Sequence, residues 1–502
     1  MTGQAQPRSS LLVGLRQNLA SWVNWPAEAA EPGPQAAARS GLGSVRAMGT
    51  CRTARSSSRR PSTDRPRRRR ARQCHGAAGL VAVSALVFAA AGCSSPGTTG
   101  GAHKPSSSKA ASATPEPSTH AGNGATTQGP TPQESAEAVQ GPAPLPTAAQ
   151  LAALRAQAGE ISKLSPAQQA GQRVIYSYNG VTAPPDLLTL IRHGEVGGVI
   201  FFSFNVVSPT QLHGVIGQMI AANSASTNPA RQYPLLLMTD QEGGLVRRLP
   251  WAGPTESEAQ IGASADPAAG AATAGSQAAS GLRGVGLNVN LAPVLDVYRQ
   301  AGDFDDQFQR SYSMNPAVVS AAGAAFVRAQ QAGQVAATVK HFPGLGAATA
   351  AENTDNGPVA IDLPASTLQA IDEYPYGAAI SAGVKLAMVS WARYPALDQR
   401  LPAGLSPTIV HGDLQGRLGF TGVTITDALG AGALDAYGSL QNKTMLAARA
   451  GMDALLCTAI KPLPGWKCLA GLQTGYLDGA LPKTAFQAQL AQLLQLRAGL
   501  PS

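Results

Sequence analysis

From about residue 165 onward, short apolar runs alternate along the chain with longer segments of helical periodicity. Eight runs of four to six residues are rich in β-branched and aliphatic side chains. Such nearly continuous apolar runs are typical of strands whose outer face is covered by helices. The runs span residues 173–177, 198–202, 235–240, 287–291, 335–340, 385–390, 423–427 and 454–457.

Segments rich in Ala, Leu and Gln lie between these runs and have the period of an amphipathic helix. They include residues 209–223, 316–332, 364–382 and 439–450, and a final helix at about 482–497. Eight strands that alternate with eight helices predict an α/β fold, a (β/α)8 TIM-type barrel in one domain. An open, doubly wound sheet is the alternative. In such a barrel, function is located at the carboxyl ends of the strands.

A leader precedes this region. Arginines between residues 65 and 72 are followed by an apolar stretch at about 77–91 and then by Cys93. This order indicates a secretory signal, and the apolar stretch is shorter than the ~20 residues of a membrane span. Residues 90–93, Ala-Ala-Gly-Cys, resemble a bacterial lipobox, in which the cysteine is acylated. We therefore expect an extracytoplasmic lipoprotein, anchored to the outer face of the cell membrane through Cys93. A plain signal peptide is the alternative.

The composition divides the chain into three parts. Residues 1–92 are the N-terminal extension and signal peptide, within which Met48 is a plausible start. Residues 93–148 are rich in Ser, Thr and Pro, and a segment with so little apolar bulk is expected to be a disordered linker. Residues 149–502 form the barrel domain.

The positive charge is confined to the leader. The chain carries 38 Lys and Arg against 29 Asp and Glu, a net charge of +9. Residues 1–92 hold 14 Arg and three acids, which leaves 24 bases and 26 acids for the rest. The barrel domain therefore has no electrostatic basis for binding nucleic acid.

Two of the five cysteines lie in the expected barrel domain. Cys457 and Cys468 are separated by ten residues, in a loop-like stretch with two prolines. Outside the cytoplasm, such a pair predicts a structural disulfide. No histidine lies close to them in sequence, and no cluster has the spacing of metal ligands, so we expect neither a metal nor another cofactor.

Charged residues follow three of the predicted strands. Asp240 ends the third strand, and two glycines behind it allow a ligand to approach the backbone closely. Lys340 and His341 end the fifth strand, and Asp427 ends the seventh. Because these ends meet at one rim, the charged groups predict a binding site there.

Four motifs occur in order along these strands. They are Asp-Gln-Glu-Gly-Gly at 240–244, Leu-Ala-Pro-Val-Leu-Asp-Val at 291–297, Lys-His-Phe-Pro-Gly at 340–344 and Gly-Phe-Thr-Gly-Val at 419–423. Together they resemble glycoside hydrolase family 3, and most closely its β-N-acetylhexosaminidase branch. That branch acts on N-acetylglucosamine in bacterial cell-wall fragments. The resemblance covers about residues 165–460.

The resemblance implies roles for the residues at the rim. Asp427 would be the nucleophile of a retaining glycosidase, in which a second group protonates the leaving oxygen. The sugar hydroxyls would be bound by Asp240, Arg248, Arg310, Lys340 and His341. Arg310 matches the Arg-Ser-Phe segment of the family.

The chain departs from the family at the acid/base. The hexosaminidase branch carries an Asp-Ser-His segment after the fifth strand, but here Ala351 replaces the Asp and Asn353 replaces the His. Neither side chain transfers a proton. Our hypothesis is that Asp355 in the same loop is the acid/base, with Glu352 as the second candidate; both are alternatively solvated loop residues.

Two other functions stay open at this point. A lipid-anchored sugar-binding protein that has lost efficient catalysis is one, although the aspartate expected beneath the anomeric carbon argues against it. A β-glucosidase of the same family is the other, but such enzymes carry a second domain with a catalytic Glu, and only roughly 40 residues follow the barrel. The oligomeric state, the natural aglycone and the choice between water and phosphate as acceptor are not determined by the sequence.

Overall fold

The structure, a computed structural model, describes residues 143–501. Eight parallel strands form one sheet in the order β10-β1-β2-β3-β6-β7-β8-β9. A parallel bridge between Ile425 and Ala454 joins the two ends of this order. The sheet therefore closes into a barrel, which confirms the predicted (β/α)8 fold and excludes the open sheet. The strands are β1 (Val174–Tyr176), β2 (Gly198–Ile200), β3 (Leu236–Thr239), β6 (Val289–Asn290), β7 (Ala336–Phe342), β8 (Leu386–Val389), β9 (Val423–Thr426) and β10 (Leu455–Cys457).

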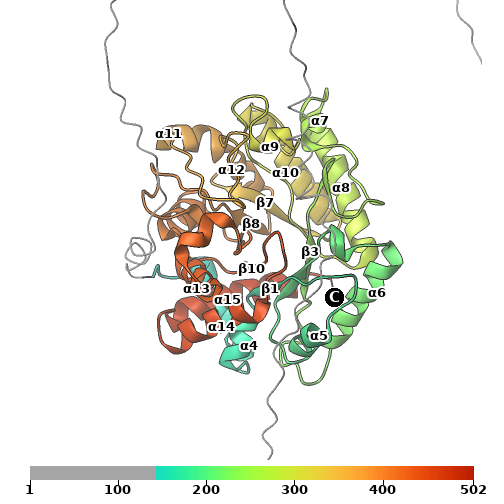
Figure 1. The fold of residues 1–502 in the computed structure, drawn as a ribbon, viewed down its shortest axis with the longest axis vertical. Coiled ribbons are helices and arrows are strands. Elements are labelled where there is room, and N and C mark those ends of the chain that lie inside the picture. Colours follow the sequence, from blue (N-terminus) through green and yellow to red (C-terminus); the bar gives the residue numbers. More distant parts are fainter. Residues whose placement is uncertain (1–142, 502) are drawn as a thin grey trace, which may run out of the picture. The chain divides into compact units, whose positions relative to one another are not determined.

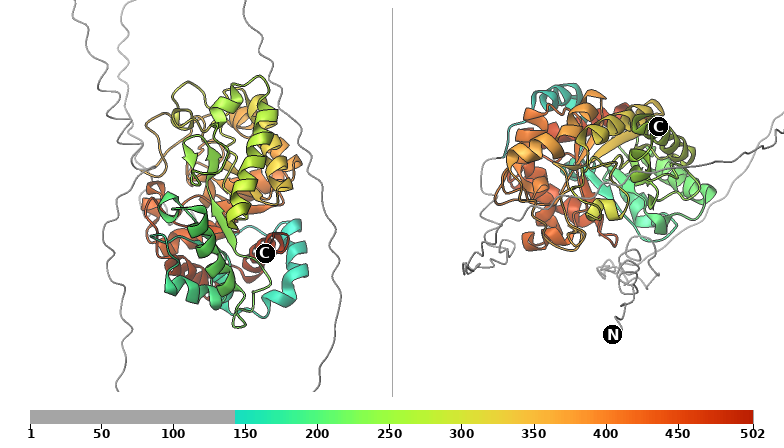
Figure 2. Two further views of the ribbon diagram at one scale, coloured as in Figure 1. Left: turned by 90° about the vertical axis from the view of Figure 1, so that its right-hand side faces the viewer. Right: turned by 90° about the horizontal axis from the view of Figure 1, so that it is seen from above.

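Helices surround the strands on the outside, as the views in Figures 1 and 2 show. The α-helices are α3 (Ala148–Ile161), α4 (Pro166–Gly171), α5 (Pro185–Arg192), α6 (Pro209–Asn223), α7 (Glu258–Gly262), α8 (Pro267–Val285), α9 (Phe304–Gln307), α10 (Pro316–Ala332), α11 (Ala365–Thr367), α12 (Tyr374–Ser381), α13 (Leu440–Ala450), α14 (Gly465–Leu477) and α15 (Lys483–Ala498). Shorter elements are the 3-10 helices η1 (Ser203–Asn205), η3 (Ala403–Leu405) and η5 (Gly432–Tyr437), the π-helical segments η2 (Leu368–Asp372) and η4 (Thr408–Arg417), and the hairpin strands β4 (Gln241–Gly243) and β5 (Val246–Arg247).

Local sequence signals set the helix ends. Helix α6 begins with Pro209 after Ser208, whose hydroxyl accepts a hydrogen bond from the Gln211 amide, as an N-cap does. Helices α8 and α13 end at Gly286 and Gly451, which have φ angles of 93° and 113°. Only glycine adopts this left-handed conformation without a steric cost.

One predicted helix is not continuous. The pattern at 364–382 predicts a single helix, whereas the structure divides it into α11, η2 and α12. Pro375 lies in the first turn of α12. Because proline has no N–H and its ring clashes with the preceding turn, a helix arriving from α11 cannot continue through it.

The strands bury both faces. On β3, Leu236 and Met238 belong to the cluster inside the barrel, whereas Leu237, and Leu235 just before the strand, belong to the cluster between strands and helices. Leu493 of α15 joins the inner cluster, and Arg497 of α15 donates to the carbonyl of Pro234, just before β3. Helix α15 therefore covers the amino-terminal end of the barrel.

The predicted cysteine pair forms a disulfide, with an S–S distance of 1.97 Å. Cys457 is the last residue of β10, but Cys468 lies in the first turn of α14 rather than in a loop. Within the described residues, no helix has both the length and the apolar character that a membrane crossing requires. The expected lipid site, Cys93, the leader and most of the expected linker lie outside these residues.

Candidate functional site

A cavity of about 260 Å³ opens at the carboxyl ends of the strands. Seven of the eight residues predicted to bind or transform a sugar line this single cavity, although they come from distant parts of the sequence. They are Asp240, Arg248, Arg310, Lys340, His341, Asp355 and Asp427.

The hairpin after β3 positions two of them. Strands β4 and β5 turn the chain back, so that the Arg248 amide donates to the Asp240 carbonyl, and the Arg248 Nε lies 3.9 Å from Asp240 Oδ2. The turn depends on Gly243, whose φ is 122°. A Cβ there would lie 2.2 Å from the Glu256 carbonyl oxygen, so no larger residue fits.

Glu242 is a member of the site that the sequence reasoning missed. Its carboxylate lies 2.6 Å from Lys340 Nζ and accepts two hydrogen bonds from Arg310, at 2.8 and 2.9 Å. Burial alone would raise the pKa of Glu242, but Arg310 and Lys340 outweigh it and lower the pKa below its usual range. The available signal was its place in the hairpin motif, two residues after Asp240.

Lys340 is held as an ammonium group between two carboxylates. It lies 2.8 Å from Asp240 and is almost fully buried. Burial alone would lower the pKa of Lys340, but Asp240 and Glu242 raise it above its usual value. Because these cations and anions are already paired, the cavity offers fixed donors and acceptors for hydroxyl groups rather than a net charge.

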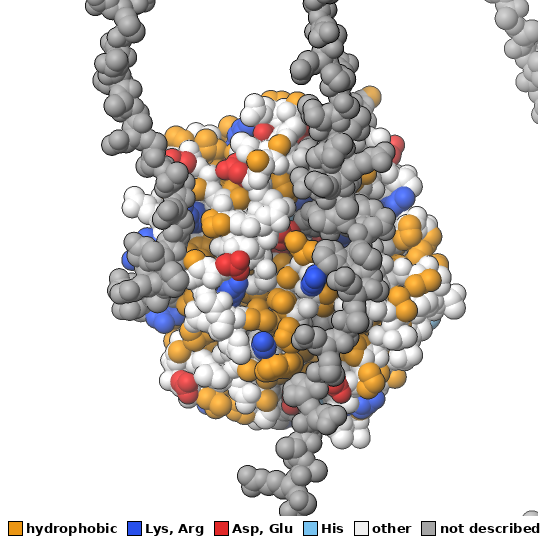
Figure 3. Space-filling view, viewed as in Figure 1, with side chains coloured by type: hydrophobic (Ala, Val, Ile, Leu, Met, Phe, Trp, Pro, Cys, Tyr) orange, Lys and Arg blue, Asp and Glu red, His pale blue; other side chains and the backbone are white. Residues whose placement is uncertain are grey.

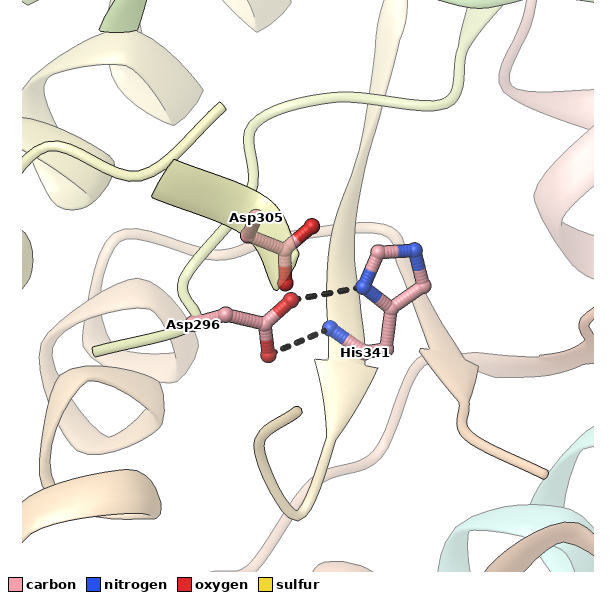
Figure 4. Close-up of side chains that lie close together, drawn as sticks. All are labelled: Asp296, Asp305 and His341. Atoms are coloured by element: carbon pink, nitrogen blue, oxygen red, sulfur yellow. Dashed lines mark hydrogen bonds and ion pairs between the residues drawn. The ribbon is translucent and has the colours of Figure 1, made fainter. Parts of the chain in front are cut away.

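His341 is held neutral by its surroundings (Figure 4). Its Nδ1 lies 2.6 Å from Asp296 Oδ2, and its Nε2 lies 3.5 Å from Arg310 Nη2. Because a guanidinium only donates, Nε2 accepts from Arg310 and Nδ1 carries the proton that is donated to Asp296. Burial, reinforced by Arg310, lowers the pKa of His341 to about 4. Asp296 also accepts from the backbone amides of His341 and Leu345, at 3.2 and 2.6 Å, so the imidazole cannot rotate freely.

Asp296, Asp305 and His341 present ligand atoms within 4.8 Å of one another, a spacing that suits a metal ion. Asp296 and His341 are paired with each other, whereas the buried Oδ2 of Asp305 has no hydrogen-bond partner among the described residues. Asp305 accepts from Arg310 at 3.0 Å, and burial together with the Asp296 carboxylate raises the pKa of Asp305 to about 7. Asp305 can therefore share its proton with Asp296. This cluster could not be recognised in the sequence, because its three members come from three separate segments.

Asp427 and Asp355 come from two loops that contact each other. Asp427 directly follows β9 and accepts from the Ala428 amide at 2.7 Å. The carbonyl of Asp355 accepts from the Gly432 amide at 2.9 Å, which ties the loop after β7 to the segment after β9. Burial, with the Asp427 carboxylate second, raises the pKa of Asp355 to about 7.

Glu352, the second acid/base candidate, is not brought to the cavity. It is absent from the lining, and its carboxylate accepts from the backbone amide and the hydroxyl of Thr349, at 2.8 and 2.9 Å. This is a local turn contact that points the carboxylate back along its own loop. Asn353, at the position of the family's histidine, does line the cavity.

Comparison with known proteins gives one consistent result. The model of the glycosyl hydrolase family 3 N-terminal domain matches residues 178–496. An uncharacterized secreted glycosyl hydrolase of Arthroderma benhamiae is 44% identical over 353 residues, which are 70% of this chain and 98% of that protein. A β-hexosaminidase of Xanthomonas axonopodis pv. citri is 34% identical over 53% of this chain and 77% of its own length.

Two solved structures of enzymes that act on N-acetylhexosamines are also similar to this chain. A glycoside hydrolase family 3 β-N-acetylglucosaminidase from Paenibacillus sp. has a TM-score of 0.62 and 31% identity, over 67% of this chain and 62% of that one. A β-N-acetylhexosaminidase from Beutenbergia cavernae has a TM-score of 0.59 and 30% identity, over 67% of this chain and 99% of that one.

Proposed function

This chain belongs to glycoside hydrolase family 3, and from that premise we propose that it removes terminal β-linked N-acetylglucosamine from cell-wall-derived glycans by a retaining mechanism. It is a glycosidase, and its relatives support N-acetylhexosamine as the sugar released. The glycan source, the covalent intermediate and the residue roles are the parts that we propose.

One observation carries the proposal. Asp427 lines the same cavity as Asp240, Arg248 and Lys340, although these residues belong to three different regions of the chain, at or after β9, β3 and β7. An aspartate beside paired donors and acceptors is the arrangement that a sugar ring needs when a carboxylate attacks its anomeric carbon.

The proposed reaction has two steps. In the first, an Asp427 oxygen bonds to the anomeric carbon, the bond to the leaving oxygen breaks, and Asp355 gives its proton to that oxygen. In the second, water attacks the anomeric carbon, Asp355 takes one proton from the water, and the bond to Asp427 breaks. Both carboxyl groups then return to their starting states.

The surroundings of Asp355 support its role as the acid. A carboxyl group must hold its proton near neutral pH to donate it, and burial beside Asp427 raises the pKa of Asp355 to about 7. A pKa close to the operating pH is best for general acid catalysis, which contributes roughly 10²–10⁴-fold. The loop contact with Gly432 holds Asp355 on the cavity side.

Hydrolysis of an aryl β-N-acetylglucosaminide and of the matching aryl β-glucoside tests this proposal. We expect turnover of the first and little of the second, and loss of kcat by several orders of magnitude in Asp427→Ala. Asp478, which is exposed at the carboxyl end of α14 and does not line the cavity, provides a control, and Asp478→Ala should retain activity. Full activity of Asp427→Ala would remove the proposed nucleophile.

A sugar-binding protein without efficient catalysis is the second candidate, because Asn353 occupies the position of the family's histidine. That function predicts saturable binding of N-acetylglucosamine with no turnover of the activated aryl substrate. Calorimetry with the free sugar, beside the turnover assay, distinguishes the two candidates.

We further propose that the protein is an extracytoplasmic lipoprotein anchored through Cys93. The proposal rests on the lipobox-like sequence and the preceding signal pattern. Expression in a bacterial host with labelled palmitate should label the wild-type chain and place it in the membrane fraction. Cys93→Ser should abolish both, whereas Cys74→Ser, in the same leader, should not. Label retained by Cys93→Ser would contradict the anchor.

A further inference from the structure

The strand order divides the mouth of the barrel into two unlike halves on either side of Asp427. In one direction from β9, the sheet continues through β8, β7 and β6 to β3. The connections on this side carry Asp240, Lys340 and Asp355 into the cavity. In the other direction, the order runs through β10 and β1 to β2. The connections on this second side contribute no charged residue to the described cavity lining.

The second side forms what we call the apolar wall, made of Phe202, Phe204, Ala459 and Ile460. All four line the cavity. The two phenylalanine rings stack with centroids 5.4 Å apart and an interplanar angle of 26°. Ile460 is 44% exposed. In Figure 3, hydrophobic side chains gather below the centre of the view, where Figure 1 places β10 and β1.

Hydrogen bonds fix the β2 part of this wall to β1. The buried side chain of Asn205 accepts from the Phe202 amide at 2.9 Å and donates to the carbonyls of Tyr178 and Gly180, at 3.0 and 2.8 Å. This single amide side chain therefore connects the aromatic pair to the connection after β1. The backbone that carries the rings is held in place before any ligand binds, which lowers the entropic cost of binding.

The β10 part of the wall is fixed in a similar way. The hydroxyl of Ser177 donates to the Cys457 carbonyl at 3.0 Å and accepts from the Leu463 amide at 3.3 Å. The disulfide between Cys457 and Cys468 closes the same segment. Ala459 and Ile460 lie between these fixed points.

The cations of the cavity come from other segments than this wall and are already paired. Among the described residues that line the cavity, they are Arg248, Arg310 and Lys340, and each forms an ion pair with Asp240 or Glu242. A negatively charged group placed on the apolar wall would lose its hydration without gaining one of these partners. That loss is costly for a carboxylate.

The wall suits a sugar ring better than a chain of methylenes. Aromatic rings pack against flat apolar surfaces, and a pyranose presents such a surface through its C–H bonds. The other lining residues of these two connections include Ser203 and Thr458, whose hydroxyls are uncharged hydrogen-bonding groups for sugar hydroxyls.

We propose that the apolar wall binds the aglycone, and that it selects an uncharged sugar ring stacked on Phe204 over a sugar that bears a carboxylate. This proposal rests on the proposed function and narrows the range of substrates that it includes. Among cell-wall-derived glycans, the preferred substrates are those in which terminal N-acetylglucosamine is linked to a neutral sugar. A muramic acid aglycone, with its lactyl carboxylate, is disfavoured.

Three disaccharides test the charge preference. They are N,N′-diacetylchitobiose, the β-linked N-acetylglucosamine–N-acetylmuramic acid disaccharide, and the methyl ester of the latter, which removes the charge and keeps the ring. The wild-type enzyme should have a kcat/KM at least about tenfold higher for the first than for the second, since an unpaired carboxylate is costly to desolvate. The ester should recover most of that difference. Equal rates for all three would overturn the proposal.

Substitution of Phe204 in the apolar wall tests where the aglycone binds. Phe204→Ala should lower kcat/KM for diacetylchitobiose by about tenfold, the scale of one aromatic contact, and leave inhibition by free N-acetylglucosamine unchanged. Val207→Ala provides the control, because Val207 is 66% exposed on the same connection and does not line the cavity. An equal weakening of inhibition by the free sugar would place Phe204 against the released sugar instead and overturn the proposal.

Binding separates this proposal from the proposed function. The three disaccharides are titrated into Asp427→Asn, in which no covalent step occurs. Preference for diacetylchitobiose over the acidic disaccharide supports the wall even if the wild-type enzyme turns over none of them, an outcome that would refute only the hydrolase mechanism. Tighter binding of the acidic disaccharide overturns the wall.

Discussion

At the scale of single residues, Asp355 and Asp427 combine two states of the same chemical group. Asp355 is pushed toward its protonated form by burial and by the carboxylate of Asp427. Surroundings that keep one carboxyl group protonated and leave the other ionised allow the same residue type to donate a proton and to attack as a carboxylate. The pH dependence of the activity therefore tests the role of Asp355.

The activity should fall on the alkaline side. Asp355 holds its proton below its pKa of about 7, and the first step needs that proton. For a substrate with a poor leaving group, kcat/KM should therefore fall by about tenfold per pH unit above pH 7. An activated aryl substrate, whose leaving group needs little protonation, should show a much weaker fall. A profile that stays flat from pH 6 to 9 on the poor substrate would exclude Asp355 as the acid.

The sequence predicted residues that directly follow a strand better than residues whose role depends on ion pairs. Asp240, Lys340 and Asp427 directly follow apolar runs, and that position alone predicts the rim of a barrel. Glu242 and Asp305 gave no such signal, because their importance comes from ion pairs with Arg310 and Lys340 that form only in the folded chain. Glu352 shows the opposite case, because a carboxylate in the right loop turns to its own backbone.

At the scale of elements, the hairpin of β4 and β5 connects local backbone conformation to the site. It carries Glu242 and leads directly to Arg248, and its path depends on Gly243 and Gly244, with φ angles of 122° and 51°. The two glycines could be read from the sequence as a close backbone approach. Their contact partners, Glu256 for Gly243 and Ser257 for Gly244, could not be read from it, because that segment returns from a later part of the chain.

Gly243→Ala should therefore damage stability and activity together. The added Cβ would lie 2.2 Å from the Glu256 carbonyl oxygen, in a conformation that L-residues rarely adopt, and we expect a loss of about 1–3 kcal/mol in unfolding free energy. Displacement of the hairpin should also lower kcat/KM. Gly159→Ala in α3 is the control, because no atom lies within 4 Å of its Cβ and alanine favours a helix. Urea unfolding and aryl-substrate kinetics measure both effects; an unchanged midpoint for Gly243→Ala would contradict the expectation.

The boundaries of the elements were also only partly predictable from the sequence. Apolar runs located all eight strands because a buried strand needs nothing beyond its own side chains to be recognised. The helix expected at 364–382 was interrupted at Pro375 and by the π-helical segment η2. The proline was visible in the sequence, but periodicity on both sides of it hid the break.

At the scale of the whole molecule, the two ends of the barrel have different tasks. The carboxyl end holds the cavity, whereas α15 covers the amino end and packs against α3. The inner apolar cluster lies between them and includes residues of β3, β8 and β9. This separation allows stability to be altered at one end without disturbing chemistry at the other.

Leu493→Ala tests that separation. Leu493 is fully buried in the inner cluster, and removal of a buried leucine side chain leaves a cavity that costs about 3 kcal/mol. We expect the midpoint of urea unfolding to fall accordingly, while kcat and KM on the aryl substrate at 25 °C stay within about twofold of wild type, because the site lies at the opposite end of the strands. Leu477→Ala, at a side chain that is 61% exposed, should change neither. A large rise in KM for Leu493→Ala would show that packing beneath the barrel controls the geometry of the sugar site, and that the two ends do not act independently.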